Sequence, residues 1–520
     1  MRYIIKQYPD LLEKVKKMSV EELLRTVICP NFNLRRRTPV KNTGSVFIHP
    51  AEQEQVRKAL TELNADRTEP ALAASDMEYG AGKMIEGAVR FPSMRAAAEA
   101  GDVELAYQMG VCAAKEALRL GYHWTFAPCV DILGNRRNPI VSIRTAGEDA
   151  DTVIRYGGAY MMGIQDAGMI ATLKHFPGDG YSFDDQHITT TENPLSCEEW
   201  DASFGKLYRT LIEKGAKSIM PGHISLPSYD EIDPETGMYP PATLSKNLMT
   251  ELLRKKLGFE GIIISDATGM SGFCGYINFY RACARFLEAG GDCLLFVHET
   301  EDFVSEMKKH IASGYLKLET LQNRAYRMLC FSREYFEEHT NLNMGDFESK
   351  DAEKYAEEMT RKSMKIVRDR ANLLPFKIDG QTRIAHFILS NVGTPAPALA
   401  VVSDLTEKLK KVAKTVDEFT DPGPENAKKI AKSGNYDLII CSVANEMSYG
   451  LNVVKLSGPI ARNMMQGWMR YNTPVIFVSY YDPYFGDDFY TTVDTLINTY
   501  GYSYFTNDVL LEKICGTDKK

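Results

Sequence analysis

A fourteen-residue stretch gathers many of the side chains in this chain that could do chemistry. Residues 174–187 read KHFPGDGYSFDDQH and contain two histidines, one lysine and three aspartates. The apolar run 169–173 leads directly into them, which predicts that they follow a buried strand. Such groups could bind a metal, form an acid/base apparatus or line an ordinary polar loop.

Asp185 and His187, at the end of this stretch, are separated by one residue. On an extended or turn backbone two such side chains can project the same way, so the carboxylate can orient and charge-stabilise the imidazole. A pair of this kind can serve as a general acid and base near neutral pH. An isolated D-x-H is a weak signal, because most chance matches lie in surface loops.

Asp266 closely follows three isoleucines in the segment GFEGIIISDATGM. A strand-end aspartate is held on rigid backbone, which suits a nucleophile whose position must be fixed. A helix N-cap aspartate is equally at home after a strand. Asp266 is therefore a candidate nucleophile with a structural alternative.

The elements that must position these groups are short apolar runs separated by stretches of helical periodicity. Short runs that do not alternate with polar residues indicate a parallel sheet covered on both faces. Eight such units over about 300 residues predict a (β/α)₈ TIM-like barrel. The runs are 26–29, 45–49, 71–76, 124–128, 170–175, 218–223, 261–266 and 293–298.

Several of these runs end on a polar residue, and five such residues are candidates for a site. In a barrel the strand ends share the carboxyl rim, where this fold places its catalytic groups. Any one of them alone could be an ordinary loop start, but five on one rim favour a site. They are His49, Asp76, His175, His223 and Asp266.

The remainder of the chain indicates a second domain of alternating strands and helices. It contains neither GxGxxG nor GxxxxGK[ST], so no motif in it points to nucleotides. We predict a catalytic barrel over 1–345, a linker helix over 346–368, and a smaller doubly wound α/β sandwich domain over 369–520. The aromatic stretch YYDPYFGDDFY (480–490) favours a domain or subunit interface over a carbohydrate platform, which makes a homodimer a candidate assembly.

Composition limits the partners and the compartment. The chain has 520 residues, 44% of them hydrophobic, and a net charge of −8, which predicts a soluble protein and argues against nucleic-acid binding. We find no signal peptide and no transmembrane run, so we expect a cytoplasmic protein without a membrane partner. Its ten cysteines are scattered, with no two closer than nine residues, so they form neither a CxxC metal site nor a compact disulfide framework.

Two classes of reaction compete at the predicted rim. Barrel amidohydrolases need an HxH pair after the first strand, and TVICPNFN contains none. Glycoside cleavage by covalent catalysis needs a fixed nucleophile and a separate proton donor, which Asp266 and His187 can supply. The residues favour glycoside cleavage without a metal.

Several motifs together resemble glycoside hydrolase family 3, in its β-N-acetylglucosaminidase branch. They are KHFPGxGxxxxDxH, SDATGM, SDMEYG and RNPIVSIRTAGED, and the similarity extends over nearly the whole chain. The resemblance implies a retaining glycosidase without cofactor or metal. Asp266 would form a glycosyl-enzyme, and His187, oriented by Asp185, would protonate the leaving oxygen and then activate water.

The resemblance also implies which groups grip the sugar hydroxyls. These positions match Asp76, Arg144, Lys174 and His175, and His223 is either a further substrate-binding rim residue or packed beneath the site. The implied substrate is an oligosaccharide or small molecule with a terminal β-linked N-acetylglucosamine. A phosphorylase, a β-glycosidase of other sugar preference, and a decayed carbohydrate-binding protein are the alternatives.

This chain departs from the family pattern around the sugar. Asp179 stands where the family has a histidine, EYGAGKM lacks the family arginine, and RTAG replaces RxFG. None of these changes removes Asp185, His187 or Asp266. The reaction type is therefore better supported than the identity of the sugar.

Overall fold

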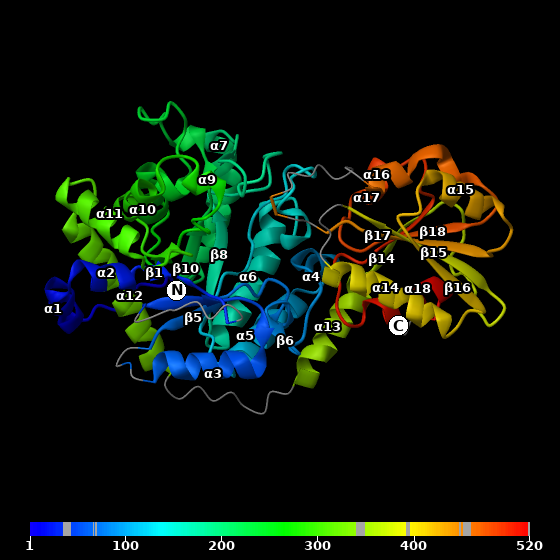
Figure 1. Cartoon of the computed structure of the whole chain (residues 1–520), viewed down its shortest axis with the longest axis horizontal. Coiled ribbons are helices and arrows are strands. Elements are labelled where there is room, and N and C mark those ends of the chain that lie inside the picture. Colours follow the sequence, from blue (N-terminus) through cyan, green and yellow to red (C-terminus); the bar gives the residue numbers. More distant parts are fainter. Residues whose placement is uncertain are drawn as a thin grey trace. The chain divides into compact units, whose positions relative to one another are not determined.

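The computed structural model divides into two compact units, which we describe separately (Figure 1). It describes residues 1–34, 43–65, 67, 70–339, 349–391, 396–446, 449–450 and 459–517. The first unit comprises residues 1–89, 106–135 and 147–352, and the second comprises 90–105, 136–146 and 353–520. The domain boundaries expected from the sequence stay a prediction. Within the described residues, no helix is long and apolar enough to cross a bilayer.

All eight expected barrel strands form, although most are shorter than their apolar runs. Seven parallel strands make one sheet in the order β12-β10-β8-β7-β5-β3-β2, and β1 pairs with β13. The eight expected strands are β1 (Ile28–Cys29), β3 (Ser45–Ile48), β5 (Leu72–Ser75), β7 (Trp124–Thr125), β8 (Ile170–Phe176), β10 (Ser218–Pro221), β12 (Ile262–Ile263) and β13 (Leu294–Leu295). The short strand β2 (Asn31–Phe32) is not among the expected strands and pairs with β3.

Two links join the ends of this sheet into a barrel. A parallel bridge between Ile264 and Cys293 continues β12 towards β13. On the other side, Pro30 directly follows β1, and its carbonyl accepts a hydrogen bond of 2.9 Å from the Phe47 amide of β3, which links β1 to β3. The carboxyl ends of all these parallel strands therefore face one rim, as the sequence predicts.

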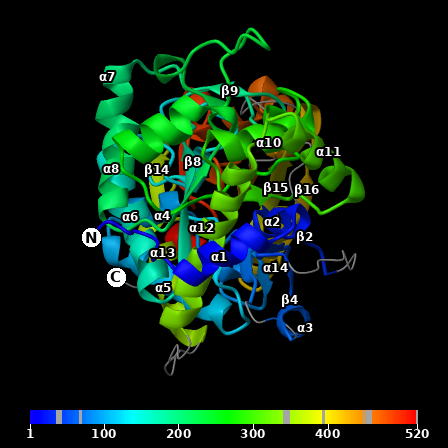
Figure 2. The same ribbon diagram turned by 90° about the vertical axis from the view of Figure 1, so that its left-hand side faces the viewer.

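From β3 onwards, helices lie between successive barrel strands and cover the outside of the barrel, as Figure 2 shows around β8. In α8 the buried side chains recur at one-turn spacing, so one face of the helix packs on the strands. The longer helices are α1 (Pro9–Lys17), α2 (Val20–Thr26), α3 (Gln53–Asn64), α5 (Val103–Leu118), α6 (Ala150–Asp166), α8 (Lys206–Glu213), α10 (Phe279–Ala289), α11 (Glu301–Ala312) and α12 (Leu318–His339), with a π-helix over Asn247–Lys256.

The second unit contains a six-stranded sheet in the order β14-β19-β18-β17-β15-β16. All its neighbouring strands are parallel except β14, which runs antiparallel to β19. This is a doubly wound order, because the chain reverses its direction of travel across the sheet after β16. The strands are β14 (Lys365–Asp369), β15 (Arg383–Ser390), β16 (Thr415–Thr420), β17 (Leu438–Ala444), β18 (Val475–Ser479) and β19 (Thr495–Asn498).

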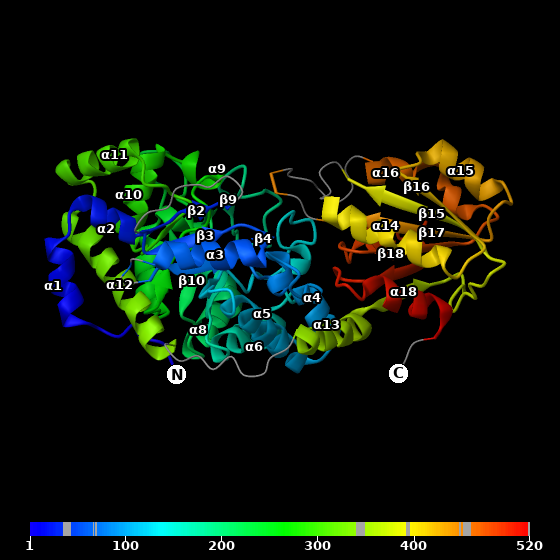
Figure 3. The ribbon, with the colours of Figure 1, turned by 60° about the horizontal axis from the view of Figure 1, so that its bottom comes forward.

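Helices cover both faces of this sheet (Figure 3). One hydrophobic cluster includes residues of α14 (Ala396–Lys410) and α18 (Thr506–Cys515), and a second cluster includes residues of α15 (Pro424–Lys432) and α16 (Pro459–Asn463). The shorter helices α4 (Met94–Glu99) and α17 (Phe485–Asp488) also belong to this unit.

The segment expected to be a linker helix over 346–368 is helical only in part. Helix α13 covers Ser349–Ser363, and the chain then enters β14 at Lys365. Ile366 and Val367 are β-branched, and the edge of β19 is available to pair with them, so the strand replaces the end of the helix. Residues 346–348 lie outside the described part of the chain.

The aromatic stretch 480–490 belongs largely to the interior of the second unit. Tyr480 and Tyr481 are buried in one hydrophobic cluster and Phe485 in the other, whereas Tyr490 is exposed. These contacts agree with a packing role for the stretch. The homodimer stays a prediction.

Candidate active site

The Asp185–His187 pair forms as the sequence predicts. His187 Nδ1 lies 2.6 Å from Asp185 Oδ1, and the His187 amide donates to the same oxygen over 2.8 Å. The Asp185 side chain is fully buried, whereas 26% of the His187 side chain is exposed. The carboxylate therefore fixes the ring through Nδ1, which leaves Nε2 as the atom for proton exchange.

The loop that carries this pair is held from both sides. At Gly178 (φ +123°) and Gly180 (φ +110°) a Cβ atom would lie 2.2 Å from Phe204 and 2.1 Å from the Ile132 carbonyl, so both positions need glycine. At its far end the Ser271 amide donates to the His187 carbonyl over 3.0 Å. The loop is therefore joined to the segment that follows Asp266.

Asp266 lies just beyond β12, with 13% of its side chain exposed. Its Oδ1 accepts the Ala267 amide at 2.7 Å, and its Oδ2 lies 3.9 Å from His175 Nε2. Burial raises the pKa of the Asp266 carboxyl, but His175, His223 and His187 and the Ala267 amide outweigh it and lower the pKa. The carboxylate is thus anionic and partly accessible, as a nucleophile must be.

Lys174, in β8, connects two acidic side chains. Its Nζ lies 2.9 Å from Asp76 Oδ1 and 2.7 Å from Glu78 Oε1. Lys174 and Glu78 are buried, whereas about a third of the Asp76 side chain is exposed. The lysine therefore orients an exposed carboxylate that can accept hydrogen bonds from hydroxyl groups.

Asp131 is a further residue of this site that the sequence analysis did not identify. It is fully buried, and its Oδ2 lies 2.7 Å from His175 Nδ1. Its Oδ1 accepts the amides of His175 and Asp179 at 3.1 and 2.8 Å. Burial raises the pKa of Asp131, but His175 and these hydrogen bonds lower it overall. His175 thus has the same arrangement as His187, with a buried carboxylate on Nδ1 and Nε2 directed at the rim.

One set of described side chains has the composition of a metal site. Potential ligand atoms of Cys129, Asp131 and His175 lie within 4.8 Å of one another. These atoms already bond to one another, since Cys129 Sγ donates to Asp131 Oδ2 at 3.1 Å and His175 shares the same oxygen. A metal would have to displace both hydrogen bonds, so the geometry fits a hydrogen-bonded support for His175.

His223 is fully buried beneath the rim. Its Nδ1 lies 3.0 Å from Thr243 Oγ1 and its Nε2 3.0 Å from the Ala267 carbonyl. Burial lowers the pKa of His223. Because both ring nitrogens bond within the protein, the geometry favours a role in supporting Ala267 and the adjacent Asp266 over contact with a ligand.

Two other expected sugar-site residues are buried in different surroundings. The amide of Asp179 binds Asp131, and its Oδ1 accepts the Gly180 amide at 2.6 Å, so this aspartate supports the loop. Arg144 lies in the segment 136–146 that belongs to the second unit. Its Nη1 donates to the Ile140 carbonyl at 3.4 Å, and its role in binding sugar stays a prediction.

Comparison with known proteins decides the family. The profile of the glycosyl hydrolase family 3 N-terminal domain matches residues 12–331, which is more than half of the chain. This protein belongs to glycosyl hydrolase family 3. It is therefore a glycosidase, as the KHFPG and SDATGM motifs indicate.

The similar members of family 3 include enzymes named for two kinds of sugar. A β-N-acetylglucosaminidase/β-glucosidase of Cellulomonas fimi is 30% identical over 491 residues, covering 91% of this chain and 86% of that protein. A β-hexosaminidase of Chromobacterium violaceum is 30% identical over 256 residues, covering 48% of this chain and 69% of that protein.

Among solved structures, β-glucoside phosphorylase BglX bound to 2FGlc has a TM-score of 0.88 at 26% identity, covering 99% of this chain and 96% of the other. A family 3 β-N-acetylglucosaminidase from Paenibacillus sp. str. FPU-7 has a TM-score of 0.80 at 24% identity, covering 96% and 97% of the two chains. The second likeness shows the fold of both units, a TIM-like barrel followed by an α/β domain.

Proposed function

We propose that this glycosidase removes a terminal β-linked N-acetylglucosamine with retention of configuration, using Asp266 as nucleophile and His187 with Asp185 as acid and base. The observation that carries the proposal is the 2.6 Å contact between His187 and Asp185 on a loop bonded directly to the segment after Asp266. An anionic carboxylate and a carboxylate-oriented imidazole on one rim are the two groups that the double displacement requires.

In the first step Asp266 attacks the anomeric carbon, and the bond from this carbon to the leaving oxygen breaks. Protonated His187 gives its Nε2 proton to that oxygen, so the alcohol departs neutral and the imidazole becomes neutral. Asp185 keeps the Nδ1 proton in place and stabilises the cationic ring before transfer. The sugar is now an ester of Asp266.

In the second step a water molecule attacks the same carbon from the face that the leaving group vacated. Neutral His187 removes the proton from this water through Nε2, the ester bond breaks, and Asp266 returns to its carboxylate form. Two inversions restore the original β configuration. Histidine can serve in both steps because its charge changes readily near neutral pH.

The sugar itself would be held by Asp76, Lys174 and His175. Asp76 is exposed enough to accept hydroxyl hydrogens, and His175 Nε2 is close enough to Asp266 to contact a sugar bonded there. The β-N-acetylglucosaminidase/β-glucosidase and β-hexosaminidase relatives support a β-linked sugar of this class.

Phosphorolysis is the second candidate, because the phosphorylase structure covers nearly all of this chain. In that reaction phosphate replaces water in the second step and a sugar 1-phosphate is released. A neutral imidazole next to the acceptor repels phosphate less than a carboxylate would. The acid/base pair described above is compatible with either acceptor.

The test is to incubate the protein with aryl β-N-acetylglucosaminide, β-glucoside and β-xyloside, each with and without inorganic phosphate, and to identify the products by NMR. We expect turnover of the N-acetylglucosaminide with a β-anomer as first product. A fluorinated glycosyl fluoride of the preferred sugar should add one sugar mass to the peptide that contains Asp266. A rate that needs phosphate selects the second candidate, and no turnover of any glycoside contradicts both.

A further inference from the structure

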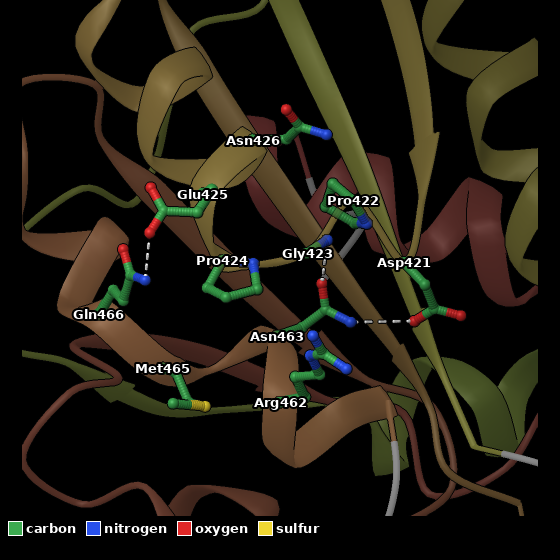
Figure 4. Close-up of a pocket in the computed structure, with 10 residues that line it drawn as sticks. All are labelled: Asp421, Pro422, Gly423, Pro424, Glu425, Asn426, Arg462, Asn463, Met465 and Gln466. Atoms are coloured by element: carbon green, nitrogen blue, oxygen red, sulfur yellow. Dashed lines mark hydrogen bonds between the residues drawn. The ribbon is translucent and has the colours of Figure 1, made fainter.

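The second unit contains a pocket at the carboxyl edge of its sheet, with a volume of about 810 Å³ (Figure 4). Its wall is built from the residues that follow β16 and begin α15, and from the end of α16 and the 3-10 helix Met465–Arg470. In doubly wound folds this edge is where ligands bind, because the loops there diverge. The lining includes Asp421, Gly423, Glu425, Arg462, Asn463 and Gln466.

The floor of the pocket is rigid. The buried Asn463 accepts the Gly423 amide at 2.7 Å and donates to Asp421 Oδ1 at 3.3 Å. Asp421 has a left-handed backbone (φ +43°), and its Oδ2 accepts the Ser390 hydroxyl at 2.7 Å. These bonds tie the pocket to the ends of β15 and β16, so its shape exists before a ligand arrives.

The chemistry of the lining disfavours an anion. Two carboxylates, Asp421 and Glu425, face one guanidinium, Arg462, among the lining residues. The start of α15 is also a poor anion site, because Pro424 has no amide hydrogen and the Gly423 amide already binds Asn463. A phosphate or nucleotide would meet net repulsion here.

The same lining suits a neutral ligand with many hydroxyl groups. Figure 4 shows that Glu425 and Gln466, which both line the pocket, point toward each other and are joined by a hydrogen bond, so the lining offers a carboxylate acceptor and a side-chain amide. Pro422, Pro424 and Met465 add apolar surface that can contact the C–H groups of a sugar ring. We propose that this pocket is a second carbohydrate site, of a size to take one or two sugar units, and that it does not take part in catalysis.

Tryptophan side chains can report on this pocket and on the active site separately. The chain has three tryptophans. Trp468 lies beneath the pocket, where its indole N–H donates to the Asn463 carbonyl at 2.6 Å. Trp200 donates to the Pro177 carbonyl at 2.8 Å, within the KHFPG segment. Labelling the full chain with 5-fluorotryptophan gives one ¹⁹F resonance for each, assigned with Trp→Phe variants.

The experiment titrates the labelled Asp266→Asn protein with N,N′-diacetylchitobiose, with cellobiose and with inorganic phosphate. The Asp266→Asn background prevents turnover during the measurement. We expect at least one sugar to shift the Trp468 resonance with saturation in the millimolar range. The shift should be lost in Glu425→Ala and Gln466→Ala. Gln381→Ala, an exposed glutamine before β15 at the opposite edge of the sheet, should retain it.

The proposal is overturned if neither sugar moves the Trp468 resonance, if phosphate moves it instead, or if the shift survives in both pocket variants. The Trp200 resonance reports binding at the KHFPG segment independently. If the sugars shift the Trp468 resonance but not the Trp200 resonance, the result counts against the proposed catalytic function alone. If they shift the Trp200 resonance but not the Trp468 resonance, the result counts against the second site alone.

Discussion

The two ends of the barrel both bury charged side chains, but they pair them differently. At the amino end Asp292, just before β13, receives Arg327 Nε at 2.9 Å on Oδ1 and Arg254 Nη2 at 2.6 Å on Oδ2. The Ile263 amide also donates to Oδ2 at 2.9 Å. At the carboxyl end Asp266 has the Ala267 amide on one oxygen and His175 at 3.9 Å from the other.

This difference in pairing suggests that Asp292 contributes to the stability of the barrel and Asp266 to its reactivity. A buried carboxylate whose two oxygens are both paired cannot also bind a ligand. If it is removed, the buried cations around it are left without a counter-charge, which destabilises the fold. A carboxylate that is held on one side and exposed on the other can bond to a substrate. The comparison predicts that substitutions at the amino end affect folding and that those at the carboxyl end affect turnover.

Asp266→Asn should give the largest effect. Removing the nucleophile without changing its size should lower kcat by more than about 10⁴-fold. Its melting temperature should equal that of the wild type, because Asp266 has few bonds to lose. Steady-state kinetics and thermal unfolding measure the two quantities. Asp184→Asn, an exposed neighbour of the acid/base pair, is the matched control and should keep full activity. Activity retained in Asp266→Asn would refute the mechanism.

His187→Ala tests the proton transfer at the same end. For glycosides with a basic leaving group we expect a loss of about 10²–10⁴-fold in kcat/KM. A dinitrophenyl glycoside should lose far less in its first step, because its leaving group departs without a proton. Pre-steady-state release of the phenol measures that step. Equal losses on both substrates would mean that His187 is not the acid.

Asp292→Asn tests the amino end. Leaving three arginines around a neutral amide should lower the free energy of unfolding by about 3–5 kcal/mol, while the folded fraction keeps its kcat. Burial raises the pKa of Asp292, but Arg327, Arg254 and Arg324 lower it overall, below the ordinary value of 3.8. The contribution of the carboxylate is therefore present above pH 3.8 and is lost as the pH falls through the folded pKa.

Chemical unfolding of wild type and Asp292→Asn at several pH values checks this dependence. The difference between them should be constant near neutral pH and shrink below about pH 4. A loss of kcat in folded Asp292→Asn, without a loss of stability, would remove the distinction between the two ends of the barrel.

Asp131→Asn should give the smallest effect, because Asp131 positions His175 and does not reach the rim. The side-chain amide keeps one of the two acceptor oxygens, so we expect a loss of about 10–100-fold in kcat/KM through misplacement of the ring. The pH profile should change with it, since the charge beside His175 is gone. A variant with an unchanged pH profile and only lower stability would show that Asp131 is structural.

Much of the framework could be predicted from the sequence because the strands are buried on both faces. Most barrel strands lie within the short apolar runs, and the polar residue that ends several of these runs marks the rim. The pair Asp185 and His187 could be predicted because the two residues that make the contact are separated by only one residue in the sequence. A contact between residues so close in the sequence depends little on how the rest of the chain folds.

The remaining features depend on contacts between distant parts of the chain. Asp131 is separated from His175 by 44 residues, and nothing local distinguishes it from other loop aspartates. Glu78 acquires its partner Lys174 in the same way. Strand β14 forms because β19 offers an edge, although the preceding residues have helical periodicity. Asp179 departs from the family pattern yet supports the loop through its backbone amide and one side-chain oxygen.

The bonds from Ser271 and Gly272 to the carbonyls of His187 and Gln186 have a consequence for protein engineering. They join the acid/base loop to the start of α9 (Ser271–Cys274), so two segments that are far apart in sequence form one structural module. A loop grafted from a relative with a different proton donor should therefore be exchanged together with residues 267–275. Transplanted alone, the new loop would have to bond to backbone amides whose positions match the present loop, and its distance from the nucleophile would change.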